Sequence, residues 1–128
     1  MSEARQKRVF IVEDETLVLF NLEDILADLG CEVVGQAMSL PEAERLAGSI
    51  PLPDAAILDV NIGGKTVFPA AEILAARGVP ILFATGYGRD GLPPKWQDRP
   101  VIVKPYSQGE VAAALDALAD AAGRRASA

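Results

Sequence analysis

The sequence predicts an α/β fold in which a five-stranded parallel sheet is doubly wound, with helices on both faces. Apolar runs and helical segments alternate five times along the 128 residues. This alternation is typical of parallel strands joined by right-handed helical crossovers. Residues 55–58 and 80–84 are apolar without alternation, which indicates strands that are covered on both faces.

Each expected element has a local signal. β-rich or apolar runs mark five strands, at residues 8–12, 31–37, 55–59, 80–85 and 101–104. Helical periodicity and helix-ending residues mark helices at about 16–29, 40–47, 69–77 and 108–122. Ser39 and Ser107 each precede a glutamate by three positions, which is the spacing of a capping box at a helix start. Residues 86–100 are rich in glycine and proline, so we expect only a turn or two of helix there.

The length of the chain fits a single domain. For five parallel strands in a domain of this size the usual order is 2-1-3-4-5, the flavodoxin-like arrangement. We expect the domain at residues 8–122, after a polar lead at 1–7 and before a loose, flexible tail at 123–128.

The composition excludes several classes of function. No apolar run approaches the ~20 residues of a membrane span, and the net charge of −6 argues against binding to nucleic acid or to anionic membranes. A single cysteine, Cys31, excludes an internal disulfide and suits a cytoplasmic protein. The chain has no histidine, which removes the usual general base and nearly every serine or cysteine triad.

Polar residues end four of the expected strands. In chain order they are Glu13 with Asp14, Asp59, Thr85 and Lys104. Because the carboxyl ends of parallel strands share one edge of the sheet, we expect these side chains to converge. Two carboxylates about 4 Å apart repel by about 4 kcal/mol at an effective dielectric constant near 20. A divalent cation relieves this repulsion, and oxygen ligands favour Mg²⁺.

A cation beside a carboxylate, a hydroxyl and an ammonium group suits phosphoryl transfer. The acceptor would be Asp59, which is central and is followed by the flexible loop 61–64. Taken singly, each polar residue also has an ordinary structural explanation. Glu13 and Asp14, for example, could simply complement the dipole of the next helix. It is their joint occurrence at successive strand ends that favours a site.

Two other classes of protein compete with this interpretation. An aspartate-nucleophile phosphohydrolase would form the same acyl phosphate, but such enzymes usually carry a second aspartate where this chain has Asn61. A flavodoxin or another nucleotide binder would need a phosphate-cradling loop after the first strand. Residues 13–15, Glu-Asp-Glu, would instead repel phosphate there.

The chain resembles a response-regulator receiver domain over essentially its full length. The residues that carry this resemblance are Glu13-Asp14, Asp59, Thr85 and the dipeptide Lys104-Pro105. Residues 83–88, Phe-Ala-Thr-Gly-Tyr-Gly, further resemble the single-domain "FAT GUY" receivers, which are associated with alphaproteobacterial general stress signalling.

The resemblance implies a stand-alone response regulator rather than a turnover enzyme. Mg²⁺ would be bound by the side chains of Asp14 and Asp59, by the backbone carbonyl of Asn61, and by Glu13 through water. A sensor histidine kinase would phosphorylate Asp59, and Lys104 and Thr85 would then contact the phosphoryl group. The peptide bond before the proline at position 105 would be cis. The signal would pass to a downstream protein or phosphotransferase, and a receiver that only docks, without phosphorylation, remains an alternative.

Two features of the sequence depart from the family's pattern. The family's switch aromatic falls at Val101, and Tyr106 stands where phenylalanine is common. We therefore expect a different switch, in which residues 86–100 become ordered on phosphorylation. Tyr106 or Tyr87 would report the change, and we favour Tyr106 because it lies close to Lys104 in the chain.

The first helix offers candidate partner contacts. Its apolar stripe predicts that Val18, Leu22, Ile25, Leu26 and Leu29 are buried. That phase places Leu19 at the rim and Phe20 on the opposite side. The receiver resemblance implies that this helix helps to dock the kinase, so we expect Leu19 and Phe20 to contact a partner.

Overall fold

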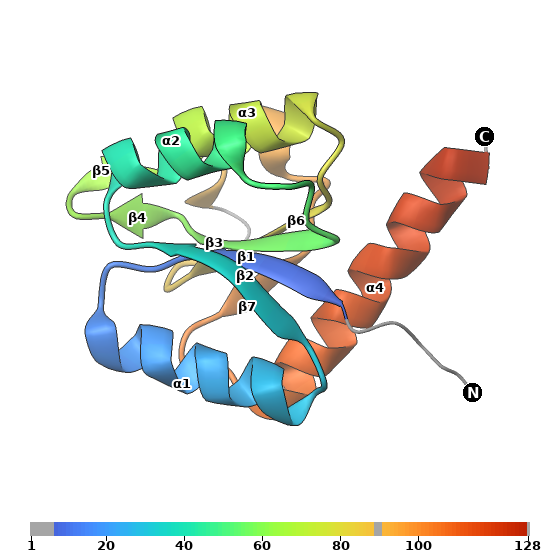
Figure 1. Cartoon of the computed structure of the whole chain (residues 1–128), viewed down its shortest axis with the longest axis horizontal. Coiled ribbons are helices and arrows are strands. Elements are labelled where there is room, and N and C mark those ends of the chain that lie inside the picture. Colours follow the sequence, from blue (N-terminus) through green and yellow to red (C-terminus); the bar gives the residue numbers. More distant parts are fainter. Residues whose placement is uncertain (1–6, 89–90, 128) are drawn as a thin grey trace.

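A parallel sheet of five strands lies between two layers of helices in the computed structural model, which describes residues 7–88 and 91–127, with side chains to residue 119 (Figure 1). The strands of this sheet are β1 (Arg8–Val12), β2 (Glu32–Ala37), β3 (Ala55–Asp59), β6 (Ile81–Thr85) and β7 (Val101–Val103). Their order is β2-β1-β3-β6-β7 and every pair is parallel. The predicted fold class and strand order are confirmed.

Helices cover the two faces of the sheet in pairs (Figure 1). On one face α1 (Thr16–Asp28) and α4 (Gln108–Ser127) pack against a core that includes Ile11 and Leu82. On the other face α2 (Leu40–Ser49) and α3 (Phe68–Ala76) pack against Phe10 and Phe83. Because both faces are covered, β3 and β6 are buried along their whole length, as their apolar runs predict.

Hydrogen bonds at two helix starts confirm the predicted caps. The backbone N–H of Glu110 donates to Ser107 Oγ at 3.1 Å, and the N–H of Ser107 donates to Glu110 Oε1 at 2.8 Å. This reciprocal pair is a complete capping box. At the start of α2, Ser39 Oγ accepts from the N–H of Glu42 at 3.4 Å. These caps fix where both helices begin.

The predicted buried face of the first helix is confirmed at Leu22, Ile25 and Leu26 but is wrong in the first turn. Leu19 is 3% exposed and packs in the core with Leu22 and Leu26, whereas Val18 is only partly buried. Residues 17–20 are all apolar, so the periodicity alone does not decide which of them faces the sheet. Leu19 is therefore a core residue and not a partner contact. Phe20, at 54% exposed, does lie on the surface.

The last helix is longer than predicted. α4 continues to Ser127, so the expected helix end near residue 122 is wrong. A single glycine at position 123 costs a helix only about 1 kcal/mol, so it does not have to end the helix. Residues 1–6 of the predicted polar lead, and residue 128 of the tail, lie outside the described residues.

A short hairpin follows β3 where only a flexible loop was expected. β4 (Asn61–Ile62) pairs antiparallel with β5 (Lys65–Thr66). The two residues between them, Gly63 and Gly64, have φ angles of +60° and +83°. A two-residue turn of this kind needs positive φ at both positions, which glycine adopts without strain. The segment after Asp59 is therefore an ordered hairpin and not a flexible loop.

In its described part, the segment between β6 and β7 contains the short 3-10 helix η2 (Pro94–Trp96), as the glycine and proline content predicts. Leu92 and Trp96 are buried in the core. The ring of Trp96 lies 5.6 Å from that of Phe83 and 6.2 Å from that of Phe68, measured between centroids. The later part of the segment is therefore anchored to the sheet and to α3. The segment's residues 89 and 90 lie outside the described ones.

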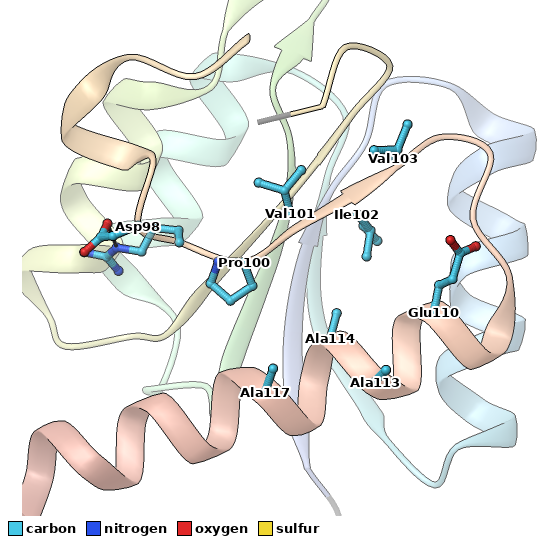
Figure 2. A pocket seen from close by; sticks show the side chains of 10 residues that line it. Asp98, Pro100, Val101, Ile102, Val103, Glu110, Ala113, Ala114 and Ala117 are labelled. Carbon is cyan, nitrogen blue, oxygen red and sulfur yellow. Dashed lines mark ion pairs between the residues drawn. The ribbon is translucent and has the colours of Figure 1, made fainter. Parts of the chain in front are cut away.

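A groove of about 600 Å³ lies between the edge strand β7 and α4 (Figure 2). Ala113, Ala114 and Ala117 line it on the helix side, and Val101 and Val103 line it on the strand side. The groove exists because alanine side chains are too small to fill the space beside the strand. Among the helices of residues 7–88 and 91–127, none has the length and apolar character to cross a bilayer.

Candidate functional site

Asp59 and Glu13 lie side by side at the carboxyl edge of the sheet. Asp59 is the last residue of β3, and Glu13 follows the neighbouring strand β1. The backbone N–H of Glu13 donates to the carbonyl oxygen of Ala37, which extends the pairing of β1 with β2 to this position. Both carboxylates are buried. The sheet therefore places two acidic groups inside the protein, where charge is costly unless it is paired.

Lys104 supplies that pairing. Its Nζ lies 2.9 Å from Asp59 Oδ2 and 2.9 Å from Glu13 Oε1. The backbone N–H of Lys104 donates to the carbonyl oxygen of Thr85, which fixes the residue at the end of β7. The Lys104–Pro105 peptide bond is cis, as the resemblance implies. One ammonium group thus bridges the two buried carboxylates.

The hairpin holds the remaining acidic group. The backbone N–H of Gly63 donates to Asp14 Oδ2 at 2.8 Å, and the N–H of Asn61 donates to Asp59 Oδ1 at 3.3 Å. The side chain of Asn61 accepts from the N–H of Gly64 at 3.1 Å and so stabilises the turn. The β4–β5 turn therefore orients both aspartates. The Gly-Gly pair in the sequence is the signal that could have predicted it.

The three carboxylates suit a divalent cation. Ligand oxygens of Glu13, Asp14 and Asp59 all lie within 4.8 Å of one another. In a two-residue hairpin the residues that flank the turn, here Ile62 and Lys65, form a hydrogen-bonded pair, and the pair Asn61–Thr66 next to it does not. The next hydrogen bond runs from the N–H of Val67 to the carbonyl oxygen of Val60. The carbonyl oxygen of Asn61 therefore lies outside that ladder. An all-oxygen set of this kind fits Mg²⁺.

Burial shifts the acid–base properties of the site. It raises the pKa of Glu13 from 4.5 to about 7, and the hydrogen bonds from Lys104 and the Glu15 N–H offset this only in part. For Lys104, burial alone would lower the pKa, but the hydrogen bonds to Asp59 and Glu13 outweigh it, so the pKa lies above its usual range. The lysine is therefore charged at any physiological pH, whereas Glu13 is poised to exchange a proton.

Thr85 lies on the other side of Asp59. It ends β6, the neighbour of β3, and its Oγ1 accepts from the backbone N–H of Tyr87 at 3.0 Å. Thr85 and Asp59 line one small pocket of about 160 Å³, together with residues of the hairpin and of the segment after β6. The pocket has room for a small anion beside the Asp59 carboxylate.

The structure thus brings together the residues predicted for the site. Glu13, Asp14, Asp59 and Lys104 form one connected cluster, and Thr85 shares a pocket with Asp59. Tyr106 lies on the α1 and α4 side of this cluster, where its ring packs against the core. The Gly63 N–H was not predicted as part of the site, because residues 61–64 were expected to form a flexible loop and the Gly-Gly turn signal was not used.

Comparison with known proteins supports the same interpretation. No model of a known protein family matches the chain. The solution structure of SdrG from Sphingomonas melonis Fr1 is 42% identical, with a TM-score of 0.76, and the match covers 91% of this chain and 98% of that one. The PhyR response regulator REC domain of Erythrobacter litoralis is 26% identical, with a TM-score of 0.72, over 88% of this chain and 89% of that one.

A curated relative is matched over part of its length. The transcriptional regulatory protein PdtaR of Mycobacterium tuberculosis is 33% identical over 114 residues, which is 86% of this chain. The chain spans only about half of PdtaR, 55% of its length. With the sheet order and the acidic cluster, these relatives show that the chain belongs to the response-regulator receiver domains and resembles the alphaproteobacterial receivers SdrG and PhyR.

Proposed function

We propose that this receiver domain accepts a phosphoryl group on Asp59 from a sensor histidine kinase, with Mg²⁺ bound at the acidic cluster. The observation that carries the proposal is the environment of Asp59. Its carboxylate is paired with Lys104 on one side and opens onto the pocket shared with Thr85 on the other. This arrangement places a nucleophile next to groups that can neutralise and hydrogen-bond a phosphoryl group.

The transfer is a substitution at phosphorus. A carboxylate oxygen of Asp59 attacks the phosphorus of phosphohistidine, the P–N bond breaks, and the imidazole nitrogen leaves with the electron pair and takes up a proton. Lys104 Nζ is positioned to hold the negative charge that develops, and Thr85 Oγ1 to donate to a phosphoryl oxygen. Bound Mg²⁺, held by Glu13, Asp14, Asp59 and the Asn61 carbonyl, would neutralise further charge on the phosphoryl oxygens.

The site favours a phosphoacceptor over a phosphohydrolase. Rapid hydrolysis of the acyl phosphate needs an acid or base two positions after the nucleophile. Asn61 occupies that position, and its amide oxygen is already used in the hairpin turn. We therefore propose a regulator whose phosphorylated form persists, not a turnover enzyme. A receiver that only docks is disfavoured, because the complete cluster is retained.

The output would pass to a protein partner or to a phosphotransferase, in the cytoplasm. The net charge of −6 opposes contact with nucleic acid or anionic membranes. The single cysteine is buried and suits a reducing compartment. The likeness to SdrG and PhyR and the residues 83–88 support a role in general stress signalling.

Intact-mass measurement after incubation with Mg²⁺ and acetyl phosphate tests the proposal. We expect one phosphoryl adduct on the wild type, none on Asp59→Asn, and an unchanged adduct on the control Asp98→Asn, which lies away from the site on the groove by α4. Many turnovers of released phosphate would support the phosphohydrolase. No adduct at all would support the docking module.

Phe20 supports a kinase-facing surface on α1. It is exposed, and so is Leu17 one turn before it, so the two form an apolar pair at the surface. We expect Phe20→Ala to slow transfer from a cognate kinase and to leave labelling by acetyl phosphate unchanged. Leu52→Ala is a matched control, since this exposed leucine lies in the loop before β3, at the opposite edge of the sheet. Equal kinase-driven rates for all three proteins would refute the assignment.

A further inference from the structure

Tyr106 places a hydroxyl group inside the protein beside the acidic cluster. Its Oη is buried and has no hydrogen-bond partner among the residues that the structure describes. The ring packs against the apolar core between the sheet and helices α1 and α4. A phenylalanine ring would fill the same space without burying an unpaired hydroxyl, which is unfavourable. The packing of the ring therefore does not explain the oxygen atom.

The surroundings of this hydroxyl are charged. Burial raises the pKa of Tyr106 to about 12, and the negative charge of Glu13 contributes in the same direction. Lys104 and Tyr106 line the same cavity of about 320 Å³ at the start of α1. In the unphosphorylated protein both carboxylate oxygens of Glu13 have a partner. Oε1 is paired with Lys104 Nζ, and Oε2 accepts a hydrogen bond from the N–H of Glu15 at 3.1 Å. The tyrosine is thus a donor without a partner on the Lys104 side of the cluster, while the carboxylate of Glu13 is already satisfied.

Phosphorylation of Asp59 would change this balance. A phosphoryl group adds negative charge at the end of β3, and the ammonium group of Lys104, already 2.9 Å from Asp59, is drawn to the phosphoryl oxygens. Lys104 then no longer holds Glu13 Oε1. The contact of Glu13 with Mg²⁺ would be through water, so the carboxylate would lack a direct protein donor at Oε1. Leaving a buried carboxylate oxygen short of donors is costly, and Tyr106 carries the unused donor on this side of the cluster.

We propose that Tyr106 is a positioning residue whose hydroxyl donates a hydrogen bond to Glu13 when Asp59 is phosphorylated. This inference rests on the proposed phosphorylation of Asp59. The hydrogen bond forms only in the phosphorylated state, so it stabilises that state selectively. Tyr106 keeps Glu13 in place while Lys104 turns to the phosphoryl group, and the family's more common phenylalanine would lack this contact.

Removing only the hydroxyl tests the inference. Tyr106→Phe keeps the ring, and Ser49→Ala is the control, because it also removes a hydroxyl group but lies at the end of α2, away from the acidic cluster. We expect Tyr106→Phe to bind beryllofluoride with Mg²⁺ about ten-fold more weakly than the wild type, as for the loss of a hydrogen bond to a charged group. The unliganded variant should be at least as stable as the wild type in urea. Ser49→Ala should match the wild type in its affinity for beryllofluoride.

A spectroscopic readout separates the hydroxyl from indirect effects. In protein labelled with 3-fluorotyrosine, the ¹⁹F resonance that disappears in Tyr106→Phe should shift when beryllofluoride and Mg²⁺ are added. Equal affinity of Tyr106→Phe and wild type, or an unmoved resonance, overturns the inference. A loss of stability in the unliganded Tyr106→Phe also overturns it, because the hydroxyl would then have a partner at rest. If the wild type itself does not bind beryllofluoride, the proposed function is refuted, and this inference is refuted with it.

Discussion

Replacing Lys104 with methionine removes the one ammonium group that bridges Glu13 and Asp59. Its Nζ lies 2.9 Å from an oxygen of each, and the two carboxylate side chains are only 3% and 8% exposed. Breaking a buried ion pair by removing one partner costs about 3–5 kcal/mol. Since the lysine side chain is itself 21% exposed, we expect the lower end, about 3 kcal/mol, at pH 8 without divalent ions.

The loss of stability should depend on pH, because the variant can neutralise its excess charge by protonating Glu13. In the wild type the pKa of Glu13 is raised from 4.5 to about 7. This group therefore stabilises the fold at low pH, and its contribution falls as pH rises to about 7 and is constant above. Without Lys104, whose hydrogen bond lowers that pKa, the folded variant keeps the proton to higher pH. Its stability then continues to fall above pH 7, by about 1.4 kcal/mol per pH unit.

Urea unfolding of wild type and Lys104→Met in EDTA measures the loss of stability and its dependence on pH. The measurements are made at pH 6, 7 and 8, which bracket the raised pKa of Glu13. The difference in free energy of unfolding should grow by about 1 kcal/mol from pH 7 to pH 8, because Glu13 in the wild type is still half protonated at pH 7. Lys95→Met is the control, since its pair with Glu72 is exposed and should contribute less than about 1 kcal/mol. The reasoning is refuted if the difference is independent of pH, or if Glu13→Gln in the same background keeps the pH dependence.

Three further outcomes follow from the packing and the site. Leu19→Ala should lower the free energy of unfolding in urea by about 2–4 kcal/mol, and Phe20→Ala should lower it by less than about 1 kcal/mol. Similar losses for the two variants would contradict the burial of Leu19. Gly63→Ala should cost about 1 kcal/mol, because its φ of +60° strains any residue with a Cβ, and thermal denaturation that matches the wild type would argue against this turn. Asp14→Ala should abolish Mg²⁺ binding in calorimetry and Glu13→Ala only weaken it, and equal losses would contradict the ranking.

The sheet and most of the site could be predicted because both depend on features that a sequence shows directly. Continuous apolar runs indicate covered strands, and the polar residues that end them must meet at one edge if the strands are parallel. Asp59, Lys104 and Thr85 were placed by that argument alone, and the structure puts them around one carboxylate. The serine caps of α2 and α4 were equally visible, since each depends on residues only three positions apart.

What could not be predicted depends on longer-range packing. The continuous apolar run 17–20 fits more than one helical phase, so only contact with the sheet selects Leu19 for burial. Strands of two residues, as in the hairpin, are too short to show alternation. The unpaired hydroxyl of Tyr106 is a property of its surroundings and not of the residue. Each of these features is decided by tertiary contacts that override local preference.

The aromatic contacts of Trp96 give the domain an intrinsic optical probe. It is the only tryptophan in the chain, and its buried indole packs against the rings of Phe68 and Phe83, which also contact each other. Lys95 Nζ and the Arg99 guanidinium carbon lie 5.4 and 5.3 Å from the ring centroid, and cations at that distance shift the emission wavelength of an indole. Phe83 precedes Thr85 by two residues on β6, so its ring and the threonine side chain lie on the same face of the strand. The fluorescence of the unlabelled protein therefore reports on the face of β6 that carries the Thr85 side chain, without any added dye.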